Sequence, residues 1–204
     1  HAKKSSKVVE MAERSKVPIV GIWDGGGQRA QDGIASLGGT GELLDRLVQC
    51  SGRIPMISLV LGPVVGVSAL GASLADFTIL GNDHGQLFMS SPLETPECIN
   101  GEVDAAGLGG ATLHASRSGI ACLIADDEEE ACALAADILG FLPDNNQSSP
   151  PVELTADEPT RLNPELATLV PDNPNRPYDM VKVIEEIVDD GIFMELFNSY
   201  AENI

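Results

Sequence analysis

Hydrophobic residues follow two alternating patterns along this chain. Residues 2–14 place valine and methionine on one side of a helix and lysine on the other, which predicts an amphipathic helix. Residues 17–23 and 54–61 are short apolar runs of the kind that are buried on both faces of a parallel sheet. An alternation of helices with such strands predicts an α/β domain whose sheet is covered on both faces.

Further helices and strands are predicted by the same patterns. Helical periodicity predicts helices at 29–37, 41–51, 66–75, 127–141 and 178–189. Apolar runs between turn residues predict strands at 76–81, 86–89, 119–125 and 192–197. Between them, a loop is expected at 90–103 and a glycine-bounded turn at 107–110.

The proline distribution indicates how the chain is divided. Eight of the 13 prolines fall within 142–177, among Asn, Asp and Ser, which predicts an extended surface connection there. We therefore expect a partial N-terminal domain at 1–141, the connection at 142–177, and a helix and strand at 178–204 that lead toward a second domain.

Composition and charge restrict the classes of partner. The net charge is -19, but residues 1–60 carry +2 and the remainder -21, which disfavours binding to nucleic acid or to an anionic membrane. Basic residues in the first 60 positions are an exception to this acidic charge, and they suit an anionic ligand: Lys3, Lys4, Lys7 and Arg29. No apolar run approaches the ~20 residues of a bilayer span, and no secretion signal opens the chain. We expect a cytoplasmic protein, or a mitochondrial matrix protein if the source is eukaryotic.

Cysteine and histidine offer little chemistry. No two cysteines form a C-x-x-C pair, and no histidine lies at metal-ligand spacing from a cysteine, so a metal site is not predicted. We expect all four thiols to be reduced and to pack as small core residues: Cys50, Cys98, Cys122 and Cys132. None of the three histidines lies beside an obvious nucleophile, which disfavours Ser-His-Asp catalysis.

Two glycine clusters follow buried strands, at 24–29 (Asp-Gly-Gly-Gly-Gln-Arg) and at 62–68 (Gly-Pro-Val-Val-Gly-Val-Ser). Glycine there lets a ligand carbonyl approach the backbone, whose N–H groups can stabilise developing negative charge. Glycine after a strand is also an ordinary turn, and the pattern alone leaves both interpretations open. The spacing fits neither a dinucleotide fingerprint nor a P-loop.

Residues 23–33 resemble the D-S-G-G-A-R-I-Q-E-G segment of the carboxyltransferase (β) subunit of biotin-dependent acyl-CoA carboxylases, of the propionyl-CoA carboxylase type. Similar segments follow in the same order along the whole chain: Leu61-Gly62-Pro63, Ala75-Asp76-Phe77, Gln86-Leu87-Phe88, Leu108-Gly109-Gly110-Ala111 with His114, Ser118-Gly119, 142–146, 176–180, 188–191 and 201–204.

The resemblance implies a crotonase-like spiral of ββα units, of which this chain covers most of the first carboxyltransferase domain. It implies transfer of CO2 from carboxybiotin, on a biotin carboxylase and biotin carrier subunit, to the α-carbon of a short-chain acyl-CoA. Such subunits form homo- or hetero-oligomers, hexamers in the family, and a second domain helps to bind biotin. The chemistry relies on oxyanion holes and placement more than on a side-chain base.

Carried over residue by residue, the resemblance assigns the catalytic backbone N–H groups to Gly26 and Gly27. It assigns substrate binding to Arg29, Gly66, Val67, Ser90 and Ser91. An ion pair with Asp24 or Asp32 is the alternative role for Arg29.

Several positions depart from the family pattern. Val67 replaces a glycine and Leu70 a tyrosine, and Ser90-Ser91-Pro92 replaces Thr-Gly-Pro. Residues 96–99 replace Lys-Thr-Val-Thr, and 105–107 replace His-Glu-Glu. These changes fit a changed substrate or reduced activity. Two alternatives therefore stay open, a biotin-dependent acyl-CoA decarboxylase subunit and a non-catalytic paralogue in a mixed oligomer.

Overall fold

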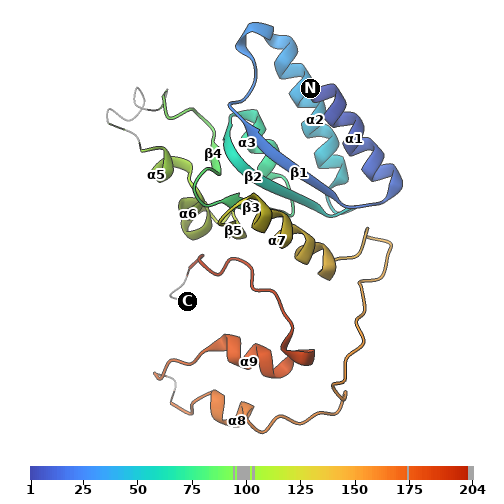
Figure 1. Ribbon diagram of the computed structural model, residues 1–204, viewed down its shortest axis with the longest axis vertical. Coiled ribbons are helices and arrows are strands. Elements are labelled where there is room, and N and C mark those ends of the chain that lie inside the picture. The colour runs from blue at the N-terminus through green and yellow to red at the C-terminus, as the bar shows by residue number, and fades with distance from the viewer. Residues whose placement is uncertain (94, 96–101, 103, 174, 202–204) are drawn as a thin grey trace. The chain divides into compact units, whose positions relative to one another are not determined.

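The computed structural model describes residues 1–93, 95, 102, 104–173 and 175–201, which divide into two compact units (Figure 1). Unit 1 comprises His1–Pro151 and the residues from Leu196 onward, and unit 2 comprises Val152–Glu195. The sheet and both glycine clusters belong to unit 1.

Helices and strands alternate in unit 1, as the sequence predicts. In chain order they are α1 (Ala2–Ser15), β1 (Ile19–Gly25), the 3₁₀ turn Ala30–Asp32, α2 (Ile34–Cys50), β2 (Met56–Val65), α3 (Val67–Ser73), β3 (Phe77–Gly81), β4 (Gln86–Phe88), α5 (Ala105–Gly109), α6 (Ala111–Leu113), the π-helical turn His114–Ser118, β5 (Leu123–Ala125) and α7 (Glu128–Phe141). Unit 2 contains α8 (Leu166–Leu169), α9 (Met180–Ile187) and the 3₁₀ turn Asp189–Gly191.

The sheet is parallel, with strand order β1-β2-β3-β5, and β4 pairs with the end of β2. The first part of β2 lies between β1 and β3, and its last three residues pair with β4. Its first five residues are all buried, as expected for a strand covered on both faces. Because parallel strands end at the same edge, the turns that follow β1 and β2 come together.

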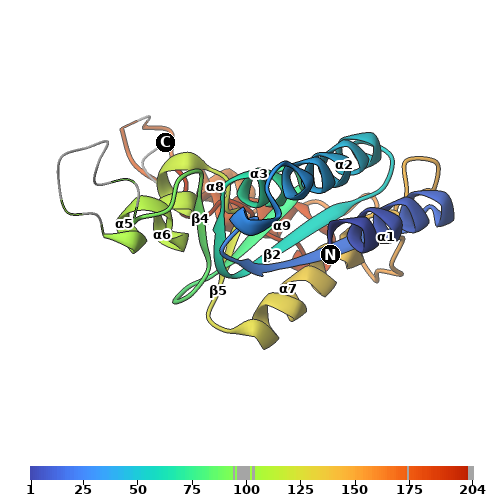
Figure 2. The same cartoon turned by 90° about the horizontal axis from the view of Figure 1, so that it is seen from above.

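Helices cover both faces of the sheet, with α2 and α3 on one side and α7 on the other (Figure 2). One core cluster joins β2, β3 and α3 with the segment around β5, and it includes Val60, Val64, Ala69, Ala72 and Leu80. A second joins α1 to α2 and β2, and it includes Val9, Leu47, Cys50, Ile54 and Met56. The small residues of α3 permit its close approach to the sheet.

The α/β class and the parallel sheet are confirmed, whereas several predicted details are wrong. The run at 17–23 gives the edge strand β1, which is not buried on both faces: Val20 is 40% exposed and Ile22 65%. The turn predicted at 107–110 lies largely in the helix α5. The helical stretches predicted at 29–37 and 41–51 belong largely to one helix, α2, which continues through Gly38, Gly39 and Gly41. Each glycine costs about 1 kcal/mol of helix propensity, which the packing of α2 on α1 offsets. The strand predicted at 192–197 is irregular, and within the described ranges no strand pairs with it.

The proline-rich stretch is divided between the two units. Its first residues pack into unit 1, where the buried Asn145 donates from Nδ2 to the Lys16 carbonyl oxygen (3.1 Å) and Asn146 donates to the Gly52 carbonyl oxygen (3.0 Å). The start of the predicted connection is therefore ordered by side-chain hydrogen bonds. In the described part of the chain, no helix is long and apolar enough to cross a bilayer.

Candidate functional site

The first glycine cluster forms a turn at the end of β1. The ideal Cβ positions at Gly25 and Gly26 meet no atom within 4 Å, so the backbone there is open to approach. Gly27 has φ of 96°, and a Cβ on it would lie 3.1 Å from the Val65 carbonyl oxygen. The turn therefore requires glycine at position 27 for its backbone conformation and for its contact with β2.

The second glycine cluster lies against the first. Val65, which contacts Gly27, ends β2, and the next residue, Gly66, has φ of 68° and precedes α3. The Gly66 amide donates to the Phe88 carbonyl oxygen of β4 at 2.8 Å. A role for Gly66 in substrate binding must therefore rest on the shape of its turn, because its own N–H has a partner.

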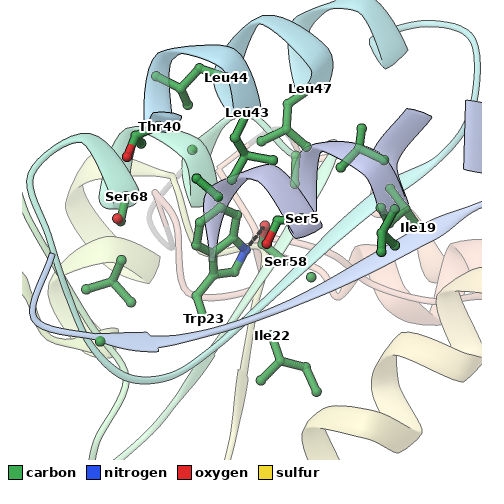
Figure 3. A pocket seen from close by; sticks show the side chains of 18 of the residues that line it. Ser5, Ile19, Ile22, Trp23, Thr40, Leu43, Leu44, Leu47, Ser58 and Ser68 are labelled. Atoms are coloured by element: carbon green, nitrogen blue, oxygen red, sulfur yellow. Dashed lines mark hydrogen bonds between the residues drawn. The ribbon is translucent and has the colours of Figure 1, made fainter. Parts of the chain in front are cut away.

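A cleft of about 600 Å³ opens beside the first turn, between α1, β1, α2 and α3 (Figure 3). Leucines of α2 and the indole of Trp23 supply apolar walls, and its polar lining includes Lys4, Ser5, Thr40 and Ser68. Gly25, Gly27 and Val67 also line it. The cleft therefore combines an apolar interior with exposed backbone of the glycine turn.

Trp23 is fixed from three sides. Its Nε1 donates to the Oγ of the buried Ser58 in β2 at 3.0 Å, which satisfies the indole N–H. A Cβ on Gly71 of α3 would lie 3.0 Å from the indole, so α3 packs directly on the ring. A Cβ on Gly21 would also approach it to 3.0 Å. Glycines on β1 and α3 thus make room for the tryptophan that walls the cleft.

The structure brings together only some of the predicted site residues. Gly27 and Val67 line the cleft, and Gly26 lies in the same turn, whereas Arg29, Gly66, Ser90 and Ser91 are not among its lining residues. Arg29 is exposed and, within the described part of the chain, pairs with neither Asp24 nor Asp32, so its guanidinium is accessible to an anion. Ser90 and Ser91 follow β4, and the Ser91 hydroxyl accepts a hydrogen bond from the Leu93 amide (3.2 Å).

Several further observations concern the expected chemistry. The departures at 96–99 lie outside the described residues. The described residues contain no cluster of His, Cys, Asp or Glu that could hold a metal ion. Burial raises the pKa of the Cys122 thiol, and burial, with the Glu13 carboxylate, raises the pKa of Cys50. Cys132 was expected in the core but is exposed on α7, and Cys98 lies outside the described residues.

Sequence reasoning grouped Lys4 with the other basic residues as a candidate for anion binding, and it gave no role to Gln28. Lys4 lines the cleft, whereas Lys3 and Lys7 of the same helix do not. Gln28 directly follows Gly27, and its Nε2 is buried with no hydrogen-bond partner among the described residues. Helical periodicity could have separated Lys4 from Lys3, but the position of the cleft was needed to choose between their faces.

A protein-family comparison matches residues 1–204 to the carboxyl transferase domain. The chain belongs to the carboxyl transferase family. Among curated relatives of this carboxyl transferase domain, the propionyl-CoA carboxylase beta chain of Roseobacter denitrificans is 40% identical over 204 residues, 100% of this chain and 40% of that protein. The methylmalonyl-CoA decarboxylase subunit alpha of Veillonella parvula is also 40% identical, with the same coverage of both chains.

Solved structures agree with this assignment. A transcarboxylase 12S structure, with methylmalonyl-coenzyme A and methylmalonic acid bound, matches the carboxyl transferase domain with a TM-score of 0.95 and 32% identity, over 99% of this chain and 39% of that chain. The crotonase-like carboxyltransferase fold that the family resemblance implies is therefore confirmed. The chain spans about two fifths of the length of the curated relatives named above.

Proposed function

We propose that residues 1–204 bind the acyl-CoA thioester in a biotin-dependent carboxyltransferase, and that the whole protein carboxylates the α-carbon of a short-chain acyl-CoA. The observation that carries this proposal is the glycine turn 25–27, which opens onto an apolar cleft in a backbone conformation that disfavours any side chain at Gly27. The 40% identity to a propionyl-CoA carboxylase beta chain supports the same interpretation.

The proposed chemistry takes place at the thioester carbonyl. Its oxygen gains negative charge when the α-carbon loses a proton, and backbone N–H donors directed at such an oxygen are each worth about 3–4 kcal/mol. The amides of Gly26 and Gly27 take this role in the proposal. A volume of about 600 Å³ lies in the range of small-molecule sites, and apolar walls suit an acyl group and its pantetheine arm.

Biotin enters the proposal only through a partner. A biotin carrier subunit would supply the carboxyl group, and the biotin ureido nitrogen, once CO2 has left it, would accept the α-proton. No described residue of this chain is assigned to hold the cofactor. We further propose a biotin carboxylase partner and a homo- or hetero-oligomer, in line with the matched transcarboxylase 12S, which assembles as a hexamer. The proposed compartment is the cytoplasm, or the mitochondrial matrix if the source is eukaryotic.

Decarboxylation is the second candidate, because the methylmalonyl-CoA decarboxylase subunit of Veillonella parvula is as similar as the carboxylase chain. The neighbouring subunit distinguishes them. A biotin carboxylase partner supports carboxylation, and a membrane sodium-pump partner supports decarboxylation. A non-catalytic paralogue is the outcome if the assembled protein turns over neither substrate, a possibility raised by Val67 in the cleft wall and by Leu70.

The test uses the full-length protein with its biotin-bearing partner. Gly27→Val should distort the turn and displace its amides, because φ is positive there and a Cβ would lie 3.1 Å from the Val65 carbonyl oxygen. Turnover of acyl-CoA should fall at least about tenfold. Gly38→Val is the matched control, because a Cβ on Gly38 of α2 meets nothing within 4 Å and Gly38 is not among the residues that line the cleft, so it should retain turnover. Circular dichroism confirms that both variants are folded. Wild-type turnover in a folded Gly27→Val protein would refute the assignment.

A further inference from the structure

His114 is a buried histidine for which the proposed chemistry has no use. It is 7% exposed and begins the π-helical turn that follows α6. Both ring nitrogens have partners: Nδ1 lies 2.8 Å from the Ser118 Oγ, and Nε2 lies 3.1 Å from the Leu87 carbonyl oxygen. Because a carbonyl oxygen can only accept, Nε2 carries a proton and donates it to Leu87.

The acceptor of this hydrogen bond is the middle residue of β4. Alternate carbonyls along a strand point to opposite sides, and the next carbonyl, that of Phe88, points toward β2 and accepts from the Gly66 amide. The Leu87 carbonyl therefore faces the side of β4 away from β2. Leu87 is 4% exposed, so water has little access, and a buried carbonyl without a donor would be costly.

The same side of β4 also makes close backbone contacts. A Cβ on Gly109 would overlap the Leu87 carbonyl oxygen, so the backbone of α5 lies directly against the backbone of β4. Gln86 and Gly110 form an isolated antiparallel bridge at the start of the strand. The short strand β4 is thus held on one side by β2 and on the other by residues 109, 110 and 114. Figure 1 shows β4 between β2 and α5.

Two proposed substrate-binding segments depend on β4. Through its Phe88 carbonyl, the strand holds the Gly66 turn at 2.8 Å, and it leads directly into Ser90 and Ser91. We propose that His114 is a positioning residue, which holds β4 against β2 through the Leu87 carbonyl and thereby fixes the Gly66 turn for acyl-CoA binding. The substrate-binding part of this inference rests on the proposed function, whereas the structural part does not.

Two variants of similar size separate hydrogen bonding from packing. His114→Gln places its amide N–H near the position of Nε2 and can still donate to Leu87, whereas the shorter amide of His114→Asn reaches only the Nδ1 position. Ser116→Ala is the matched control, because the Ser116 hydroxyl lies on the same turn but donates to the Thr112 carbonyl oxygen (2.7 Å). All are made in the full-length protein.

The readouts are hydrogen exchange of the Gly66 amide and the KM and kcat for acyl-CoA. Loss of one buried hydrogen bond should speed Gly66 exchange and raise KM about fivefold to tenfold in His114→Asn, with a smaller change in kcat. His114→Gln and Ser116→Ala should stay within about twofold of wild type, since they keep the Leu87 donor.

Different outcomes contradict different parts of the reasoning. Wild-type Gly66 exchange in His114→Asn, or equal impairment in His114→Gln, would overturn the positioning role. If His114→Asn does not fold, the His114→Gln protein still decides, because impaired exchange there contradicts the proposal and preserved exchange supports it. Faster exchange with unchanged KM would overturn the substrate role of the Gly66 turn while leaving the contact between His114 and β4 in place.

Discussion

Replacement of Gly71 by alanine tests whether α3 and Trp23 together form the wall of the cleft. Gly71 is buried in α3, and an added Cβ would lie 3.0 Å from the Trp23 Cη2 atom and 3.2 Å from the Leu44 Cδ2 atom. Overpacking of this kind costs about 1–3 kcal/mol. Alanine in place of glycine inside a helix returns about 0.5–1 kcal/mol. We therefore expect a net loss of about 1 kcal/mol of stability.

Gly41→Ala isolates the overpacking contribution. Gly41 lies in α2, is exposed, and an added Cβ meets nothing within 4 Å, so this variant should gain about 0.5–1 kcal/mol. The difference between the two variants cancels helix propensity and should equal the overpacking cost of about 1–3 kcal/mol. The assay is urea unfolding followed by circular dichroism.

Acyl-CoA affinity supplies a second readout. Gly71→Ala should push the indole of Trp23 toward the open cleft and weaken acyl-CoA binding measured by calorimetry, whereas Gly41→Ala should bind as the wild type does. Equal stability of the two variants would refute the contact between α3 and the indole. A destabilised Gly71→Ala protein with unchanged affinity would show that the ligand does not occupy this cleft.

Two further predictions concern charge and thiol reactivity. Lys4→Gln should weaken CoA binding and reduce the sensitivity of that binding to salt in calorimetric titrations. Lys7→Gln on the same helix should do neither, since Lys4 lines the cleft and Lys7 does not. Equal effects of the two variants would contradict a direct contact between Lys4 and CoA. In residues 1–204 carrying Cys98→Ser, a thiol reagent at neutral pH should label Cys132 quickly in the folded state. It should label the two buried thiols only on unfolding, because burial raises their pKa and disfavours the reactive thiolate; fast labelling of either would contradict this.

Local sequence signals predicted the elements that carry the glycine turns. Each turn follows an apolar run that predicts a strand buried on both faces, which is correct for β2 but wrong for β1, an edge strand. Gly27 and Gly66 both adopt the positive φ that glycine permits. The helix prediction failed at α2 because local propensity breaks at three glycines, while the energy that keeps the helix whole comes from its packing on α1.

The walls of the site were not predictable from local pattern. Trp23 meets Ser58 across 35 positions of the chain, and His114 meets Leu87 across 27, so neither contact leaves a periodic signal. A lone buried histidine in a sequence is as compatible with core packing as with a functional role. Likewise helical periodicity separates Lys3 from Lys4, but the sequence does not say which of these lysines faces a ligand until the position of the cleft is known.

The central claim is that backbone amides of the glycine turn hold the thioester oxygen. Infrared difference spectroscopy of an acyl-CoA labelled with ¹³C at the thioester carbonyl measures this interaction directly. In the wild-type protein the bound carbonyl stretch should move to lower frequency than in water, because two directed N–H donors polarise the bond more than solvent does. In Gly27→Val the shift should be lost. A bound carbonyl whose frequency equals that in water, at saturating ligand in the wild type, would contradict the account.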